Sequence, residues 1–140
     1  MSTRQTTTDN PYRTREPEPY SVEVDVEAHY VPEQSKPEAN RYVFAYSITL
    51  RNLGVMPARL QTRHWVITDA NGKVEEVRGE GVVGEQPRLQ PGENYSYTSG
   101  AVLETQVGTM RGAYFFHADD GTDFEVPIPE FVLSVPRTLH

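Results

Sequence analysis

Residues 41–51 read RYVFAYSITLR, and this stretch decides the fold. Large apolar side chains occupy every second position, at Tyr42, Phe44, Tyr46, Ile48 and Leu50. Successive side chains of a strand point to opposite faces, whereas a helix would spread these five residues around its circumference. The stretch therefore predicts a β-strand with one buried face.

The same alternation appears earlier in the chain, over residues 20–30. Val22, Val24 and Val26 alternate with Glu23, Asp25 and Glu27. This pattern predicts a second strand with one buried and one solvated face, and its acidic side chains discourage pairing with other molecules at a sheet edge.

Further strands are predicted along the rest of the chain. They lie at residues 58–68, 73–78, 93–99, 109–117, 124–128 and 131–135. Asn71-Gly72 predicts a tight primed turn, in which both residues take a positive φ. Pro91-Gly92 predicts a turn that lets Leu89 enter the core. Pro127 and Pro129 cannot donate to a ladder, which places the last two strands at an edge or at a crossing between sheets.

Turn signals recur roughly every ten residues, and no segment shows helical periodicity. The sequence therefore predicts an all-β fold, a two-sheet sandwich of the immunoglobulin or fibronectin type III kind with seven to eight strands. At 140 residues the chain fits one domain. We expect the sandwich to occupy residues 20–140, and the polar residues 1–19 to form a disordered tail.

Composition excludes several classes of function. The chain has no cysteine, which rules out disulfides and thiolate metal sites, and its net charge of −7 argues against nucleic-acid binding. No apolar run is long enough to span a membrane. The first residues contain no apolar segment of the kind found in secretion signals, so we expect a cytoplasmic protein.

Residues 79–84 match the pattern G-x-G-x-x-G. In dinucleotide-binding folds such glycines let backbone N–H groups approach a pyrophosphate at a helix N-terminus. Here the groups around Gly79, Gly81 and Gly84 would hold the anion, assisted by Arg78 or Arg88. No helix is predicted downstream, and Glu80 and Glu85 would repel an anion. We therefore favour a structural role, a glycine-rich connection over the sandwich edge.

Other candidate sites have ordinary interpretations. His117-Ala118-Asp119-Asp120 offers three metal ligands, but they fit solvated turn residues better, and no metal or other cofactor is implied. No catalytic triad can be assembled, so we expect no enzyme. Arg51, Arg59 and Arg63 form either an anion or partner patch or, as we expect, pairs with nearby acids.

Several motifs together resemble the ApaG family. They are residues 82–93, the Tyr97-Thr98-Ser99-Gly100 segment, Arg63-His64-Trp65, residues 108–114 and residues 128–133. The resemblance implies a small bacterial protein with a fibronectin type III-like sandwich. It further implies a link to cobalt resistance and magnesium efflux, under the name CorD, and contacts with other proteins. It supplies no catalytic residues.

These observations predict a non-catalytic protein-interaction module. Its contact surface is expected on residues 79–91 and on the strand end at residues 97–100, including Ser99. The alternative is binding of a pyrophosphate-containing nucleotide or a divalent cation at the glycine-rich loop. Open sandwiches leave strand edges unpaired, so a homodimer is also compatible with the sequence.

Overall fold

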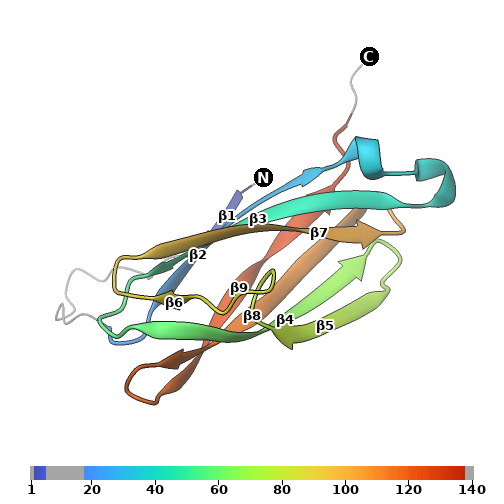
Figure 1. Ribbon diagram of the computed structural model, residues 1–140. Coiled ribbons are helices and arrows are strands. Elements are labelled where there is room, and N and C mark those ends of the chain that lie inside the picture. The colour runs from blue at the N-terminus through green and yellow to red at the C-terminus, as the bar shows by residue number, and fades with distance from the viewer. Residues whose placement is uncertain (1, 6–17, 138–140) are drawn as a thin grey trace, which may run out of the picture.

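The computed structural model describes residues 2–5 and 18–137, which form two antiparallel sheets packed face to face (Figure 1). This confirms the all-β two-sheet prediction. The first sheet has the order β1 (Ser2–Gln5), β2 (Val22–Tyr30), β3 (Tyr42–Asn52) and β7 (Asn94–Leu103). The second has the order β5 (Val74–Glu80), β4 (Ala58–Asp69), β8 (Val107–Ala118) and β9 (Asp123–Ser134), and the short β6 (Arg88–Leu89) also pairs with β4.

Two 3-10 turns, η1 (Pro32–Gln34) and η2 (Pro37–Ala39), connect β2 to β3. In the described part of the chain, no helix has the length and apolar character needed to cross a membrane.

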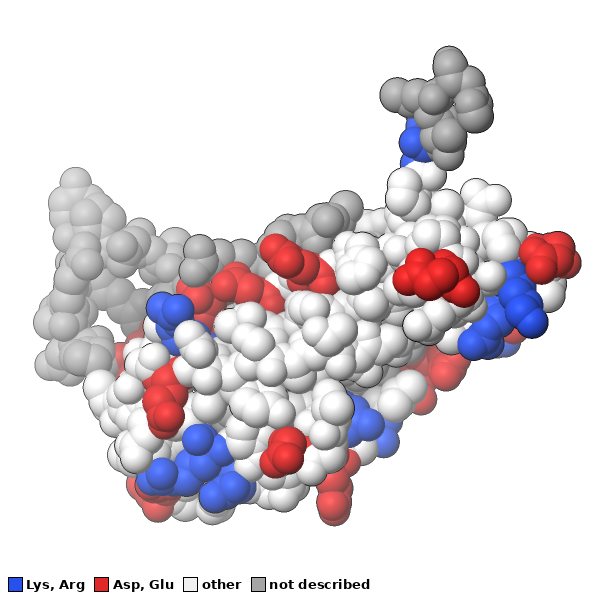
Figure 2. All heavy atoms as spheres, turned by 45° about the horizontal axis from the view of Figure 1, so that its top comes forward, with Lys and Arg blue, Asp and Glu red and all other residues white. Residues whose placement is uncertain are grey.

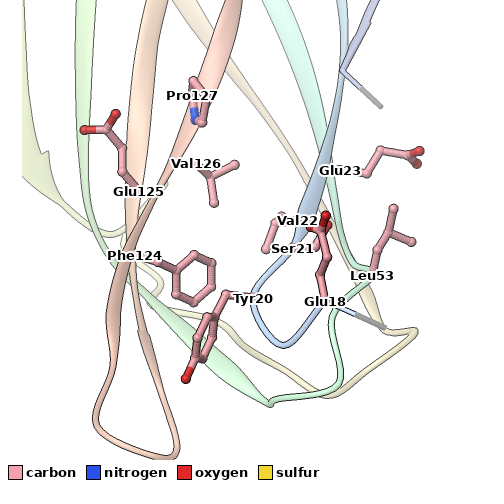
Figure 3. Close-up of a pocket in the computed structure, with 10 residues that line it drawn as sticks. All are labelled: Glu18, Tyr20, Ser21, Val22, Glu23, Leu53, Phe124, Glu125, Val126 and Pro127. Atoms are coloured by element: carbon pink, nitrogen blue, oxygen red, sulfur yellow. The ribbon is translucent and has the colours of Figure 1, made fainter. Parts of the chain in front are cut away.

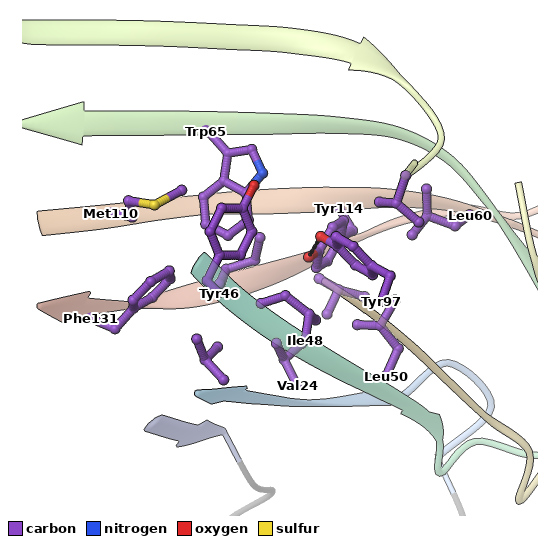
Figure 4. Packing of buried hydrophobic residues seen from close by; sticks show 14 of the residues in the cluster. Val24, Tyr46, Ile48, Leu50, Leu60, Trp65, Tyr97, Met110, Tyr114 and Phe131 are labelled. Atoms are coloured by element: carbon purple, nitrogen blue, oxygen red, sulfur yellow. Dashed lines mark hydrogen bonds between the residues drawn. The ribbon is translucent and has the colours of Figure 1, made fainter. Parts of the chain in front are cut away.

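The core lies between the sheets and is built on the stretch that decided the fold. All five alternating residues of β3 are buried, none being more than 8% exposed. Aromatic rings from the second sheet pack against them, with the Tyr46 ring 5.4 Å from the ring of Trp65 and 6.2 Å from that of Phe131 (Figure 4). The interior therefore consists of interlocking aromatic and aliphatic side chains from both sheets.

β1 corrects the prediction of a disordered tail over residues 1–19. Ser2–Gln5 pairs antiparallel with β2, from Ser2 opposite Glu27 to Gln5 opposite Val24. Ladder pairing uses backbone groups and needs no apolar side chain, so composition did not reveal this strand. Residues 6–17, which complete most of the predicted tail, lie outside the described residues.

The C-terminal strand is continuous where two strands were predicted. β9 runs through both prolines, and the register shifts between Met110 opposite Phe131 and Gly112 opposite Ile128. This irregularity accommodates Pro129, which has no N–H to donate. β9 lies at the edge of its sheet, as the prolines predicted.

Two turn predictions had different outcomes. At Gly92, φ is +85° and Leu89 is 4% exposed, which confirms the predicted turn and core plug. Asn71-Gly72 does not form a primed turn, because only Gly72 has a positive φ. The Asp69 carboxylate accepts bonds from the N–H groups of Asn71 and Lys73, so it stabilises a different turn.

The outer face of the first sheet is polar where β3 pairs with β7. Hydroxyl pairs join β3 to β7, with Ser47 and Thr98 2.8 Å apart and Thr49 and Ser96 also 2.8 Å apart. Figure 2 shows acidic side chains gathered along one side of this face and an uncharged middle. The acids of β2 are half-buried or exposed and alternate with the buried valines, as the sequence predicted.

Candidate functional site

The glycine-rich connection after β5 ends in a two-residue hairpin turn. Val82 and Glu85 exchange both backbone hydrogen bonds, at 2.8 and 2.9 Å, around Val83 and Gly84. Val83 has φ +48° and Gly84 has φ +78°, which are the positive angles of a primed turn. Val82 is 1% exposed and anchors the turn in the core, whereas Val83 at the tip is 62% exposed.

The three glycines have separate structural roles. Gly79 lies within β5, opposite Arg63. Gly81 has φ +61°, its N–H donates to the carbonyl oxygen of Gln61, and a Cβ there would lie 2.2 Å from the Glu85 carbonyl oxygen. The amides of Gly81, Val82 and Glu85 are thus already bonded within the protein. The elements that follow the loop are the strands β6 and β7, so this backbone differs from a dinucleotide-binding turn, which leads into a helix.

Arg78 and Arg88, the two arginines predicted to assist anion binding, pair with acidic side chains instead. Arg88 forms an ion pair with Asp119, and its Nε–H donates to that carboxylate at 3.1 Å. Hydrogen bonding to Arg88 lowers the pKa of Asp119. Arg78 lies opposite His64 in the β4–β5 ladder, with its Nη2 4.0 Å from the Glu76 carboxylate. Neither arginine bonds to the glycines.

Arg63 is the cation that does contact the glycine-rich connection. Its Nη1 donates to the carbonyl oxygens of Glu80 at 3.0 Å and Gly81 at 2.8 Å. A Cβ on Gly79 would be 2.8 Å from Cζ, Nη1 and Nη2, so the guanidinium lies flat against that glycine. The expectation that Arg63 pairs with nearby acids is wrong, because strand alternation places it on the core-facing side with Trp65.

Buried tyrosines lie next to Arg63. The hydroxyls of Tyr97 and Tyr114 are 2.5 Å apart, and Tyr46 lies opposite the half-buried Ser99 in the β3–β7 ladder. Burial raises the pKa of all three phenols, against a lowering contribution from the Arg63 charge. Two parts of the predicted surface therefore have identified neighbours: the glycine-rich connection contacts Arg63, and Ser99 pairs with Tyr46 in the ladder.

Comparisons with known proteins decide the family. The sequence profile of the ApaG domain matches residues 32–118, which is more than half of the chain. Protein ApaG of Xanthomonas campestris pv. campestris (strain B100) is 63% identical over 121 residues, covering 86% of this chain and 95% of that protein. The chain belongs to the ApaG family.

Other ApaG relatives agree in sequence and in fold. Protein ApaG of Dechloromonas aromatica (strain RCB) is 59% identical over 121 residues, covering 86% of this chain and 95% of that protein. The crystal structure of a putative ApaA protein from Bordetella pertussis is 53% identical, with a TM-score of 0.85. It covers 88% of this chain and 100% of that one. The family resemblance predicted from the motifs is confirmed.

The candidate metal ligands of this ApaG chain are dispersed. The Nδ1 atom of His117 lies 2.6 Å from the Asp123 carboxylate, Asp119 binds Arg88, and Asp120 accepts from the Tyr20 hydroxyl. Arg51 lies on β3, in the other sheet from Arg63, and Arg59 lies on β4, where its Nη1 donates to the carbonyl oxygen of Gln86 at 2.8 Å. Within residues 2–5 and 18–137, no group of three acidic, His or Cys side chains converges as a metal site.

A hollow at the other side of the ApaG sandwich lies between the beginnings of β2 and β9 (Figure 3). The Tyr20 and Phe124 rings pack 5.3 Å apart at its base, and Glu18, Glu23 and Glu125 line it. Its lining contains no Arg or Lys. The acids favour a solvated recess, and its lining includes none of the candidate site residues Gly79, Gly81, Gly84, Arg78, Arg88 and Ser99.

We expect the buried tyrosines to make the domain sensitive to alkali. The phenols of the unfolded chain ionise near pH 10, whereas those of Tyr97 and Tyr114 have a raised pKa in the fold. Above about pH 10 the unfolded state loses protons that the folded state keeps, so the free energy of unfolding falls as pH rises. Urea titrations between pH 8 and pH 11 will measure this decline. A Tyr97→Phe variant should show a shallower decline, and equal slopes would contradict the assignment.

Proposed function

We propose that this ApaG domain is a non-catalytic protein-interaction module whose contact surface is centred on the tip of the glycine-rich connection. Val83 carries the proposal. A β-branched residue at positive φ is a genuine outlier, and such strain costs about 1–3 kcal/mol. The strained side chain is exposed and has no packing role, which supports a role in contact with another molecule.

The neighbourhood of Val83 supports a protein partner over a small ligand. The amides of Val82 and Glu85, beside the tip, already form hydrogen bonds within the turn. Arg78 and Arg88 have acidic partners. A rigid hairpin with an apolar tip suits insertion into a pocket of another protein. The cytoplasmic location and the link to cobalt or magnesium remain predictions from the sequence.

The proposal predicts that one substitution separates binding from stability. Asn tolerates positive φ far better than Val, so Val83→Asn should raise the free energy of unfolding by about 1 kcal/mol. The same change removes the apolar tip and should abolish capture of the partner. Affinity capture from the native host, with quantitative mass spectrometry, measures binding, and urea denaturation measures stability.

Val74→Asn is the matched control, because Val74 is 57% exposed and lies at the opposite end of β5. There the change should lower stability slightly, through reduced strand propensity, and leave capture intact. Undiminished capture by the Val83→Asn variant would show that the contact surface lies elsewhere.

The alternative function is binding of a pyrophosphate-containing nucleotide or a divalent cation at the same loop. NMR titration with diadenosine tetraphosphate, with and without Mg²⁺ or Co²⁺, tests it directly. Saturable shifts of the Gly81 and Gly84 amides would favour the nucleotide, and unchanged spectra at millimolar ligand would favour the protein partner.

A further inference from the structure

Arg63 is a core-facing arginine that has no acidic counterpart among the residues that the structure describes. It lies between Tyr114 of β8 and Gly79 of β5 in the ladder. In the described part of the chain, no carboxylate lies within ion-pair distance of it, and only Nη1 donates hydrogen bonds, both to carbonyl oxygens. Partly buried charges are normally paired, so this guanidinium has unused capacity for an anion.

A second unpaired donor lies on the same face of β4. The indole Nε1–H of Trp65 has no hydrogen-bond partner among the described residues, although the side chain is only 2% exposed. A buried donor of this kind calls for a missing acceptor. Figure 4 shows the indole nitrogen turned toward the hydroxyl end of Tyr46, whose ring packs 5.4 Å away.

Arg63, Trp65, Tyr46 and Ser99 form the group that we call the Arg63 cluster. Tyr46 links two of its members, because its ring packs 5.4 Å from that of Trp65 and it lies opposite Ser99 in the β3–β7 ladder. The cluster lies beside the edge strands β5 and β7, where Arg63 and Ser99 are half-buried. It offers several donors and no carboxylate, so it suits an anionic acceptor.

We propose that the Arg63 cluster receives a carboxylate, carried by an Asp or Glu side chain of the protein partner. The assignment of this carboxylate to the partner rests on the proposed function, because the cluster adjoins the hairpin that carries Val83. One unpaired guanidinium matches the single charge of a carboxylate. The net charge of −7 disfavours a more highly charged phosphate.

The chemistry of the site can be tested without the partner. Trp65 is the only tryptophan, so the ¹⁵N-labelled full chain gives a single indole resonance. Sodium acetate should shift it saturably, with half-saturation on the order of 10 mM, whereas chloride at equal ionic strength should not. No saturable shift with acetate would overturn the site, and a stronger response to inorganic phosphate would overturn the preference for carboxylate.

Three variants locate the response. Arg63→Lys keeps the charge but loses the planar fork, and should weaken the acetate response at least about fivefold. Gly79→Ala should weaken it too, because the new Cβ displaces the guanidinium. Arg88→Lys, at a cation already paired with Asp119, should leave it unchanged. Equal acetate responses in Arg63→Lys and Arg88→Lys would overturn the role of Arg63.

The source of the carboxylate is tested with the captured partner. Arg63→Lys should lose a partner that the wild-type chain retains, and thermal unfolding should show that the variant is folded. If the Arg63→Lys variant keeps a partner that the Val83→Asn variant loses, the partner is not the source of the carboxylate. If Val83→Asn keeps its partner, the proposed contact surface fails, whereas the acetate titration still decides the site.

Discussion

Replacing Gly112 with alanine is expected to destabilise the sandwich by more than about 3 kcal/mol. Gly112 lies in β8 opposite Trp65 of β4, and its added Cβ would be 2.0 Å from the carbonyl oxygen of His64. That oxygen belongs to the backbone, so no side-chain rotation relieves the clash. The long β4–β8 ladder must separate locally, which disturbs the segment that carries Arg63 and Trp65.

Gly100→Ala provides the matched control for Gly112→Ala. Gly100 also lies in a strand, but its added Cβ would approach nothing closer than the Phe44 carbonyl oxygen, at 3.4 Å. This change should alter the free energy of unfolding by less than about 0.5 kcal/mol. Urea denaturation followed by tyrosine fluorescence and circular dichroism compares the two, and similar midpoints would mean that β4 and β8 can separate at little cost.

The parts of the fold that depend on local alternation were predictable. Tyr42 to Leu50 and Val22 to Val26 showed their buried faces directly, because side-chain direction in a strand follows from residue parity. Pro129 misled the same reasoning, since a proline interrupts the pattern whether a strand ends there or bulges. The pairing of Ser2–Gln5 with β2 was not predictable, because that contact involves backbone groups far apart in sequence.

The candidate site was predicted only in outline. Glycines at 79, 81 and 84 indicated unusual backbone, but the positive φ of Val83 contradicts the preference of its own residue type. Residue parity within the strand is consistent with Arg63 and Trp65 sharing a face, but the expectation for Arg63 followed the general tendency of arginines to pair with acids, and it was wrong. Only the three-dimensional arrangement shows that carbonyl oxygens of the neighbouring loop hold this guanidinium.

Asn52 joins three segments at one end of the sandwich. It is 2% exposed, its Nδ2 donates to the carbonyl oxygens of Met56 at 3.0 Å and Leu89 at 2.9 Å, and its Oδ1 accepts from the Gly54 N–H at 2.9 Å. The side chain thereby ties β3 to the turn after it and to β6. Both polar atoms of the side chain form hydrogen bonds, so this position requires a side chain with one donor group and one acceptor group.

Asn52→Asp keeps the shape and should cost about 3–5 kcal/mol at pH 7, because a carboxylate cannot donate and becomes a buried unpaired charge facing two carbonyl oxygens. Burial should raise the pKa of the introduced carboxyl above its unfolded value near 4. The penalty is therefore largest at neutral pH and shrinks as pH falls and the carboxyl is protonated. Urea midpoints at pH 7 and pH 4.5 measure how far the penalty shrinks.

Asn71→Asp, the same change at an exposed turn residue, is the control and should have little effect on stability. A stability gap between Asn52→Asp and the wild-type chain that is unchanged across this range would mean that lost packing, and not charge, accounts for the destabilisation.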